Sequence, residues 1–286
     1  MIGVLNINKP KGITSSQVVV KIKKTLNVKK VGHMGTLDPL ASGVLPICVG
    51  KATRLFDYFL KKQKTYIAQF KFGEETDSLD LEGNIIKTSS NIPNKEQIEN
   101  AIKSFLGQTK QVPPAYSAKK IDGKKAYDLA RQGQAVKLKP CDIFLYDYQL
   151  LSQISSDVYE FKITCSAGTY IRCLARDLGE KLNSCATMVS LKRIKSGPFC
   201  IENAIDYNSI TKEILENSIM ALNEVLIEFE KLVISKQDFQ RLLNGLDIQI
   251  KNKKEDIDYV IVCEKEIIGI GNIHNNILKL KTYLYQ

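Results

Sequence analysis

Residues 32–54, GHMGTLDPLASGVLPICVGKATR, contain the motif that decides how the rest of the chain is interpreted. Asp38 is the only acidic residue among the first 56, and it lies in a stretch rich in Gly and Pro. Such a stretch predicts an ordered loop from Val31, followed by a strand over 43–49. An Asp before a Pro is typical of a helix N-cap, and a rigid loop also gives a nucleophilic carboxylate the fixed position that attack requires. The two roles are compatible.

The composition is that of an ordinary globular protein. The 286 residues are 44% hydrophobic and 25% charged, which excludes collagen-like, disordered and disulfide-scaffold classes and predicts one large domain plus a smaller one. Seven cysteines are scattered without a Cys-x-x-Cys spacing, and there are two histidines, so neither a disulfide framework nor a metal site is expected. The longest uncharged stretch, 39–50, is too short to span a membrane, and we expect a cytoplasmic protein.

The positive charge is concentrated at the N-terminus. Residues 1–66 contain twelve Lys or Arg and two acids, so this segment alone accounts for the formal net charge of +10. A one-sided excess of this size attracts polyanions, of which nucleic acids are the most abundant in the cytosol. The alternative is a solvated, lysine-rich face, and only motifs can decide between the two.

Hydrophobic periodicity, caps and turn residues predict interleaved strands and helices. The expected strands are 2–7, 43–49, 66–72, 143–151 and 159–165, with 191–199 ending at Gly-Pro. The expected helices begin at an N-cap among Thr14, Ser15 and Ser16 and end near Leu26, and further helices are expected over 52–60, 95–105, 124–131 and 168–182. A turn is expected at 80–84, an extended segment at 112–118 and helix-rich structure at 210–230. Strands at 259–263 and 267–270 predict a separate small β domain from about residue 231.

Several long blocks, in a consistent order, resemble the TruB family of tRNA pseudouridine synthases. Besides 32–54, they are LNINKPKGITSS (5–16), KTYIAQFKFGEETDSLD (64–80), QVPPAYSAKKIDGKKAYDLAR (111–131), CSAGTYIRCLARDLGEKL (165–182) and SLKRIKSGPF (190–199). The resemblance implies an α+β pseudouridine synthase fold, with a central mixed, mainly antiparallel sheet and flanking helices. It also implies a catalytic domain over 1–230, with an insertion at 113–139 that clamps RNA. Residues 231–286 are similar in position and rhythm to the small β-barrel PUA-like domain of bacterial members.

The reaction implied by this resemblance is isomerisation of uridine 55 to pseudouridine in the T loop of tRNA. The uracil is detached from C1′, turned over and rejoined through C5, without a cofactor and without a metal. Addition of the catalytic acid at C6, its attack on C1′, and abstraction of the C2′ proton to give a glycal-like intermediate all remain open. The implied partner is the T-arm of tRNA, bound by a monomer that needs no protein partner.

Four positions match the catalytic residues of the family. Asp38 matches the catalytic aspartate, and Arg172 matches the arginine that pairs with it; seen alone, an arginine at a helix start is more often solvated. Tyr66 matches the aromatic residue that stacks on the target base, and Tyr170 matches the tyrosine beside the catalytic acid. Without the resemblance, both tyrosines would be interpreted as core or strand residues. Their family roles fit the need to extrude a base from folded RNA and to recover energy by stacking.

The resemblance also implies a set of residues on the RNA side of the site. Leu191 matches the apolar wall of the pocket, with a plain core leucine as the alternative, and His33 matches the histidine that enters the T loop. Asp80 matches a second family acid that organises RNA-side loops, and a turn-capping role fits it equally well. The remaining expected RNA contacts are lysines: Lys9 and Lys11 in the KPKG turn, where scaffolding is expected more than chemistry, and Lys119, Lys120 and Lys124 in the insertion.

Two other functions compete with this interpretation. One is a guide-RNA-dependent, dyskerin-like pseudouridine synthase, which shares the aspartate motif; the short N-terminus and compact C-terminal part argue against it. The other is an RNA-binding factor that folds tRNA and whose catalysis is incidental. The joint presence of Asp38, Tyr66, Tyr170 and Arg172 argues for an active enzyme.

Overall fold

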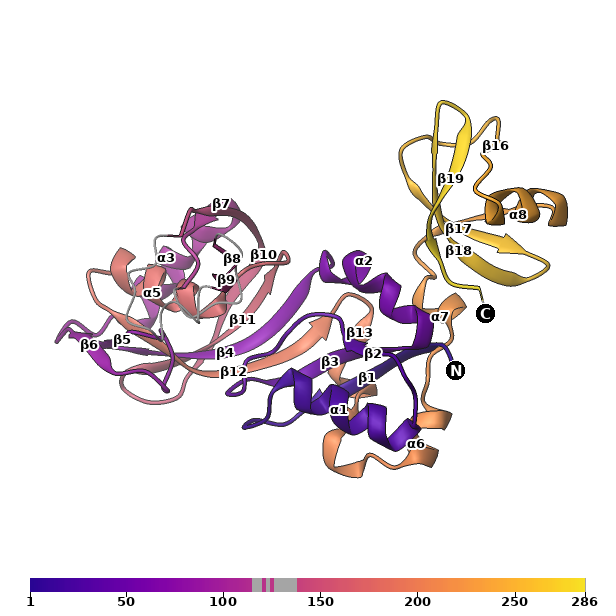
Figure 1. Cartoon of the computed structure of the whole chain (residues 1–286). Coiled ribbons are helices and arrows are strands. Elements are labelled where there is room, and N and C mark those ends of the chain that lie inside the picture. Colours follow the sequence, from indigo (N-terminus) through magenta and orange to yellow (C-terminus); the bar gives the residue numbers. More distant parts are fainter. Residues whose placement is uncertain (115–119, 122–123, 126–137, 286) are drawn as a thin grey trace.

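A long mixed sheet organises most of the chain in the computed structural model, which describes residues 1–114, 120–121, 124–125 and 138–285 (Figure 1). Its strands are β1 (Gly3–Lys9), β2 (Val31–His33), β3 (Ser42–Val49), β4 (Lys64–Phe72), β7 (Gly107–Gln111), β10 (Cys141–Gln153), β11 (Val158–Cys165), β12 (Ala186–Ser196), β13 (Phe199–Cys200) and β14 (Ile205–Asp206). They follow the order β14-β1-β3-β12-β4-β11-β10-β7, with β2 beside β3 and β13 beside β12.

The pairing of these strands is mainly antiparallel. Among the described residues, β1 with β14 and β3 with β12 are the parallel pairs of this sheet. The predicted α+β fold with a central mixed, mainly antiparallel sheet is therefore confirmed. The β3–β12 pair joins the strand after the Asp38 loop to the strand that carries Leu191, although these residues are far apart in the sequence.

The helices within residues 1–225 flank this sheet, and the helix at 236–243 packs against the C-terminal strands (Figure 1). They are α1 (Ser15–Leu26), α2 (Phe56–Leu60), α3 (Lys95–Ile102), α5 (Ile171–Lys181), α6 (Lys212–Asn217), α7 (Leu222–Val225) and α8 (Lys236–Leu243), with 3₁₀ turns η1 (Gly50–Leu55), η2 (Lys103–Phe105), η3 (Ile201–Asn203) and η4 (Tyr207–Ser209). The N-cap of α1 is Thr14, which forms a capping box with Gln17. The helix buries Val18 and Ile22 at helical spacing and ends at Asn27, which adopts a left-handed backbone.

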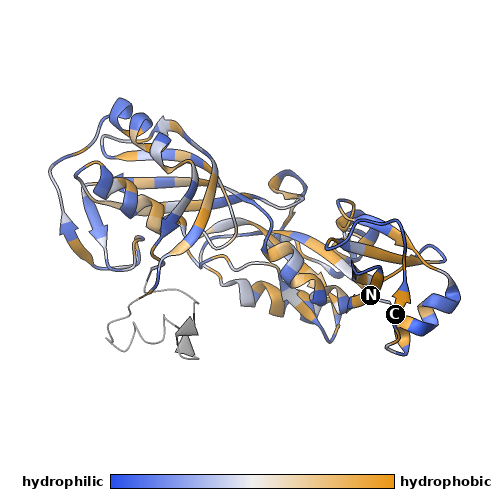
Figure 2. Ribbon diagram, turned by 90° about the horizontal axis from the view of Figure 1, so that it is seen from above, coloured by the Kyte–Doolittle hydropathy of each residue, from blue (hydrophilic) through white to orange (hydrophobic). Residues whose placement is uncertain are grey.

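The main core lies between the sheet and helices α1, α3, α5 and α6. Along β4, Tyr66, Ala68, Phe70 and Phe72 alternate with less buried residues, and hydropathy alternates along the strands in the same way (Figure 2). Helix α5 buries a nearly continuous apolar face that belongs to the same cluster as Phe70. The first turn of α5 is thereby held close to the middle of the sheet.

A second sheet is formed by the C-terminal residues. It contains β15 (Glu230–Val233), β16 (Ile248–Gln249), β17 (Asp258–Cys263), β18 (Glu266–His274) and β19 (Ile277–Tyr283), in the order β15-β17-β18-β19-β16. It packs near the N-terminus of the chain (Figure 1), where Val260 and Ile270 share an apolar cluster with Val44 and Phe59. Arg54 also donates a hydrogen bond of 2.7 Å to the backbone carbonyl of Tyr283.

The short hairpins differ in part from the prediction. β5 (Glu74–Thr76) pairs with β6 (Ile85–Thr88), and β8 (Lys120–Ile121) pairs with β9 (Lys124–Lys125). The predicted helix over 124–131 is therefore wrong at its first two residues, and its remainder lies outside the described residues, as do residues 115–118 of the predicted extended segment. The missed signal is Asp-Gly at 122–123, a dipeptide that favours a two-residue hairpin turn.

Two further segments of the N-terminal half differ in detail. Residues 31–33, predicted as loop, form β2 against β3, and the predicted helix over 52–60 begins as η1, two residues earlier. Gly50, the first residue of η1, has a φ of +65°. The pattern of apolar and polar side chains could not predict this backbone conformation. No helix in the described part of the chain combines the length and the apolar character needed to cross a membrane.

Candidate active site

The Asp38 loop is a tight turn held by one side chain from α1. The backbone N–H of Ala41 donates to the carbonyl of Asp38 at 3.0 Å, and Pro39 takes the second turn position, which its fixed φ suits. No helix follows, so the N-cap alternative for Asp38 is wrong. Buried Ser15 holds the residue before Asp38 at both backbone groups: its Oγ accepts from the N–H of Leu37 at 2.9 Å and donates to the carbonyl of Leu37 at 3.0 Å.

The KPKG turn braces the same loop. The N–H of Gly12 donates to the carbonyl of Pro39 at 2.8 Å, and the Lys9 ammonium donates to the carbonyls of Ile13 at 2.7 Å and Pro39 at 3.4 Å. Lys9 is fully buried, which lowers its pKa to about 8, and the nearby Asp38 partly opposes this shift. The enclosed ammonium, bound to carbonyls, suits the scaffolding expected of the KPKG turn and leaves Lys9 no exposed group for the RNA contact also expected of it. Lys11, in the same turn, is exposed.

Arg172 joins the two expected acids. It lies in the first turn of α5, where its Nη2 is 3.1 Å from Oδ2 of Asp38 and its Nη1 is 3.0 Å from Oδ2 of Asp80. The side chains of Arg172 and Asp80 are 8% and 4% exposed, whereas that of Asp38 is 41% exposed. The network therefore has a buried end at Asp80 and an open end at Asp38, and only the open end can meet a substrate.

Asp80 also organises the turn on which it lies. Its Oδ1 accepts from Oγ of Ser78 at 2.6 Å and from the N–H of Glu82 at 3.1 Å, while the carbonyl of Ser78 accepts from Arg172 at 3.1 Å. Leu79, between Ser78 and Asp80, has a φ of +64°, which is a strained conformation for a leucine. Strained backbone of this kind is frequent at active sites. The turn-capping role and the arginine-binding role of Asp80 thus occur together.

Tyr66 and Leu191 lie on one face of the sheet. In the β4–β12 pair, Tyr66 is opposite Arg193 and Ala68 is opposite Leu191, so the four side chains point the same way. Tyr66 and Leu191 are 9% and 8% exposed. Burial raises the pKa of the Tyr66 hydroxyl, the Arg193 guanidinium opposes this shift, and the Asp38 carboxylate adds a smaller increase. Asp38 therefore lies within electrostatic reach of this tyrosine.

Tyr170 and His33 border the same region. Tyr170 directly precedes α5, and the side-chain amide of buried Gln111 accepts from its N–H at 2.8 Å and donates to its carbonyl at 3.1 Å. His33 ends β2 and is half-buried; burial lowers its pKa, which favours the neutral ring at pH 7. Among the described residues, nothing hydrogen-bonds its buried Nδ1. A neutral ring is suited to stacking on a base.

Three of the expected lysine contacts cannot be placed as side chains. Lys119 lies outside the described residues, and Lys120 and Lys124 are described only as backbone of the β8–β9 hairpin. Conversely, sequence reasoning missed Ser15, Gln111 and Arg193, which hold backbone groups of the site. None of the three carried a signal for this role, because their partners are backbone groups.

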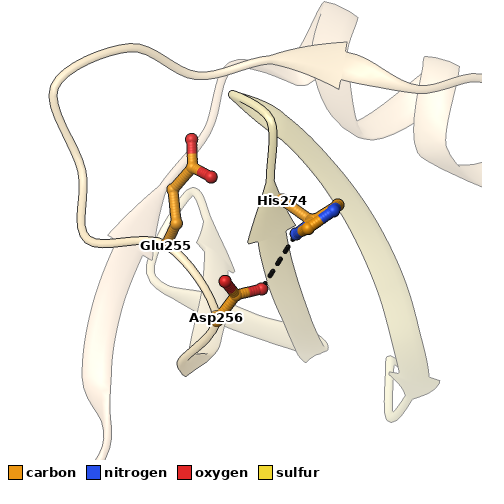
Figure 3. Close-up of side chains that lie close together, drawn as sticks. All are labelled: Glu255, Asp256 and His274. Carbon is orange, nitrogen blue, oxygen red and sulfur yellow. Dashed lines mark hydrogen bonds and ion pairs between the residues drawn. The ribbon is translucent and has the colours of Figure 1, made fainter.

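A group of metal-ligating side chain types lies far from this site. Glu255, Asp256 and His274, all exposed, place one ligand atom each within 4.8 Å of one another (Figure 3). Both carboxylate oxygens of Glu255 accept hydrogen bonds of 2.9 Å from the N–H groups of Asn275 and Asn276, while Asp256 is 2.9 Å from His274 Nδ1. These contacts brace the β18–β19 turn, and we interpret the group as structural.

Comparison with known proteins agrees with this geometry. Residues 23–171 match the family model described as the N-terminal domain of TruB family pseudouridylate synthases, and residues 172–234 match the C-terminal domain of tRNA pseudouridylate synthase B. A loop aspartate paired with an arginine from a helix on a mixed sheet, together with these matches, makes the chain a pseudouridine synthase. It belongs to the TruB family.

Individual relatives support the assignment. The tRNA pseudouridine synthase B of Clostridium novyi is 42% identical over 99% of this chain and 100% of its own length. That of Mycoplasma mobile is also 42% identical, over 97% of this chain and 93% of its own. A chain from the crystal structure of a Cbf5–Nop10–Gar1 complex is 27% identical with a TM-score of 0.72, covering 99% of this chain and 84% of that chain.

Proposed function

We propose that this enzyme isomerises uridine 55 of tRNA to pseudouridine. The observation that carries the proposal is the Asp38–Arg172–Asp80 network, in which a buried guanidinium presents one open carboxylate within electrostatic reach of Tyr66. The relatives that are 42% identical over nearly their whole length are tRNA pseudouridine synthases, which supports tRNA as the substrate. The exposed lysines of the N-terminal segment, Lys11, Lys23, Lys24, Lys29 and Lys30, would contact its phosphates.

The chemistry begins with extrusion of the uridine from its loop, because the reacting atoms are not accessible in a stacked base. The base stacks on Tyr66 against Leu191, while His33 occupies the place it has left. The N1–C1′ bond then breaks and a C5–C1′ bond forms. C5 loses a proton and N1 gains one, so product and substrate are isomers and no cofactor enters the balance. Addition at C6, attack on C1′ and removal of the C2′ proton each begin with the Asp38 carboxylate.

Arg172 has two tasks in this scheme. It holds the Asp38 carboxylate in a fixed direction, and its second contact with Asp80 prevents the guanidinium from following Asp38 into solvent. Tyr170, whose backbone is held by Gln111, closes the side of the site next to α5. These side chains supply position and charge, which are the contributions that a rearrangement without external reactants needs.

The proposal extends to domains and partners. Residues 1–230 form the catalytic domain, 113–139 clamp the T-arm, and 231–286 form a PUA-like domain; the start of β15 at Glu230 supports this boundary. The enzyme acts in the cytoplasm as a monomer, with tRNA as its only required partner. A guide-RNA-dependent reaction is the second candidate, because the fold also resembles a chain from a Cbf5–Nop10–Gar1 complex.

One experiment separates these functions. Purified protein is incubated with an unmodified tRNA T-arm stem-loop, with no guide RNA, and pseudouridine is mapped. We expect product at the position of uridine 55 from the wild type and none from Asp38→Ala, whose affinity for the RNA stays within about tenfold. Asp57→Ala, which removes an exposed acid of α2, is the matched control and retains activity. Wild-type protein that binds the RNA without converting it would support a folding factor, and dependence on a guide RNA would support the second candidate.

A further inference from the structure

Arg193 is a buried cation whose ligands are backbone carbonyls of the Asp38 loop. Its side chain is almost fully enclosed, with the residue 2% exposed. Nε donates to the carbonyl of Val44 at 2.7 Å, Nη2 to that of Gly35 at 3.0 Å, and Nη1 to that of Thr36 at 3.5 Å. None of the ion pairs found among the described residues includes Arg193. The carbonyls are therefore the groups that stabilise this charge.

These carbonyls lie on both sides of Asp38 in the chain. Gly35 and Thr36 precede it, and Val44 follows it as the third residue of β3. One rigid guanidinium thus joins the two ends of the segment that presents the carboxylate. Backbone contact reinforces the link: Arg193 pairs with Gly43, whose φ is +103°, and a Cβ at residue 43 would lie 2.2 Å from the carbonyl oxygen of Arg193.

The same side chain reaches the stacking tyrosine. Tyr66 is directly opposite Arg193 in the β4–β12 pair and shares its face of the sheet. The charge of the guanidinium opposes the rise in pKa that burial imposes on the Tyr66 hydroxyl. A single residue is therefore bound to the loop that carries the nucleophile and lies directly opposite the tyrosine expected to hold the base.

We propose that Arg193 is a positioning residue that sets the Asp38 carboxylate at a fixed distance from a base stacked on Tyr66. The inference rests on the proposed function, and it assigns to Arg193 no contact with the substrate. A guanidinium suits this task because its donors diverge in one plane and reach several carbonyls at once. A lysine ammonium carries all its donors on one nitrogen atom, so it cannot bridge both ends of the loop in the same way.

The test compares Arg193→Lys with Lys64→Met. Lys64, the first residue of β4, is another buried cation and is 5% exposed. Its ammonium donates to the carbonyls of Leu60 and Lys62, which lie outside the Asp38 loop. Three quantities are measured on each protein: the melting temperature, the affinity for an unmodified T-arm stem-loop, and the single-turnover rate of pseudouridine formation at saturating RNA. Amide hydrogen exchange over 34–44 is measured without RNA. Arg193→Gln, which leaves no buried charge, replaces Arg193→Lys if the latter does not fold.

The expected results differ between the variants. Both lower the melting temperature, but only the Arg193 variant loses rate, by about a hundredfold if the carboxylate moves by about 1 Å, with affinity unchanged. Only that variant speeds exchange over 34–44. A rate equal to that of the wild type in a folded Arg193 variant, or exchange no faster than in Lys64→Met, would overturn the proposal. Wild-type protein that makes no pseudouridine would instead contradict the proposed function, and the exchange result would still decide whether Arg193 fixes the loop.

Discussion

Asp80→Asn tests whether the buried end of the network serves catalysis. The substitution keeps the shape of the side chain and an acceptor oxygen but removes the charge that Arg172 faces at 3.0 Å. Loss of one partner from a buried pair costs about 3–5 kcal/mol, and the low end applies because Arg172 keeps Asp38 and the Ser78 carbonyl. At roughly 2–4 °C per kcal/mol, the melting temperature should fall by about 6–12 °C.

The effect on rate has a separate cause. With Asp80 neutral, the guanidinium loses the charge of one carboxylate partner and is drawn toward Asp38, which shifts the open carboxylate from its position. We expect the single-turnover rate with a T-arm stem-loop to fall by about tenfold to a hundredfold. RNA affinity should stay unchanged, because Asp80 is only 3% exposed.

Ser78→Ala is the matched control. It removes the 2.6 Å hydrogen bond to Oδ1 of Asp80 but leaves the charge opposite Arg172 in place. It should cost about 1 kcal/mol of stability and little rate. The reasoning would be refuted if Asp80→Asn and Ser78→Ala had the same rate, because Asp80 would then act only as a turn cap.

Three other changes have defined outcomes. Tyr66→Ala should lose product more than affinity, since stacking stabilises the base only after extrusion; unchanged turnover at saturating RNA would contradict this. Gly43→Ala should lower the free energy of unfolding in urea by more than about 1 kcal/mol, because the new Cβ meets the carbonyl of Arg193, and by clearly more than Gly12→Ala, where φ is also positive but the space is open. Burial holds the pKa of His33 below 6.5, so the unfolded chain binds more protons as the pH falls below that value, and stability decreases. His33→Gln should reduce the acid-side fall in melting temperature, and an identical fall would show that another group causes it.

The sequence predicts the elements with strong periodicity and clear caps. The capping residues before α1 and the alternation of β4 each depend on residues within one short segment. The local sequence is therefore enough to predict these two elements. Asp38 could be found for a similar reason, as a lone acid in a rigid basic segment. Its partner Arg172, in contrast, was identified only through the family resemblance, because a helical arginine has no pattern that reveals a carboxylate 134 positions away.

The parts that were missed depend on backbone groups. Arg193, Ser15 and Gln111 bind carbonyl and N–H groups, which every residue has, so no motif identifies their partners. The buried position of Lys9 was missed for the same reason: its ligands are carbonyls of the chain, and a lysine in a basic segment is indistinguishable from one at the surface. Such contacts become visible only when the tertiary structure brings distant segments together.

The apolar cluster beneath the C-terminal sheet makes the two sheets energetically interdependent. Met34, one residue after His33, belongs to the same cluster as Val260, Ile270 and Leu284. Heat that loosens the C-terminal strands therefore removes packing under the strand–loop junction that leads to Asp38. A calorimetric scan should record a single endotherm, and loss of catalytic competence should coincide with it instead of preceding it.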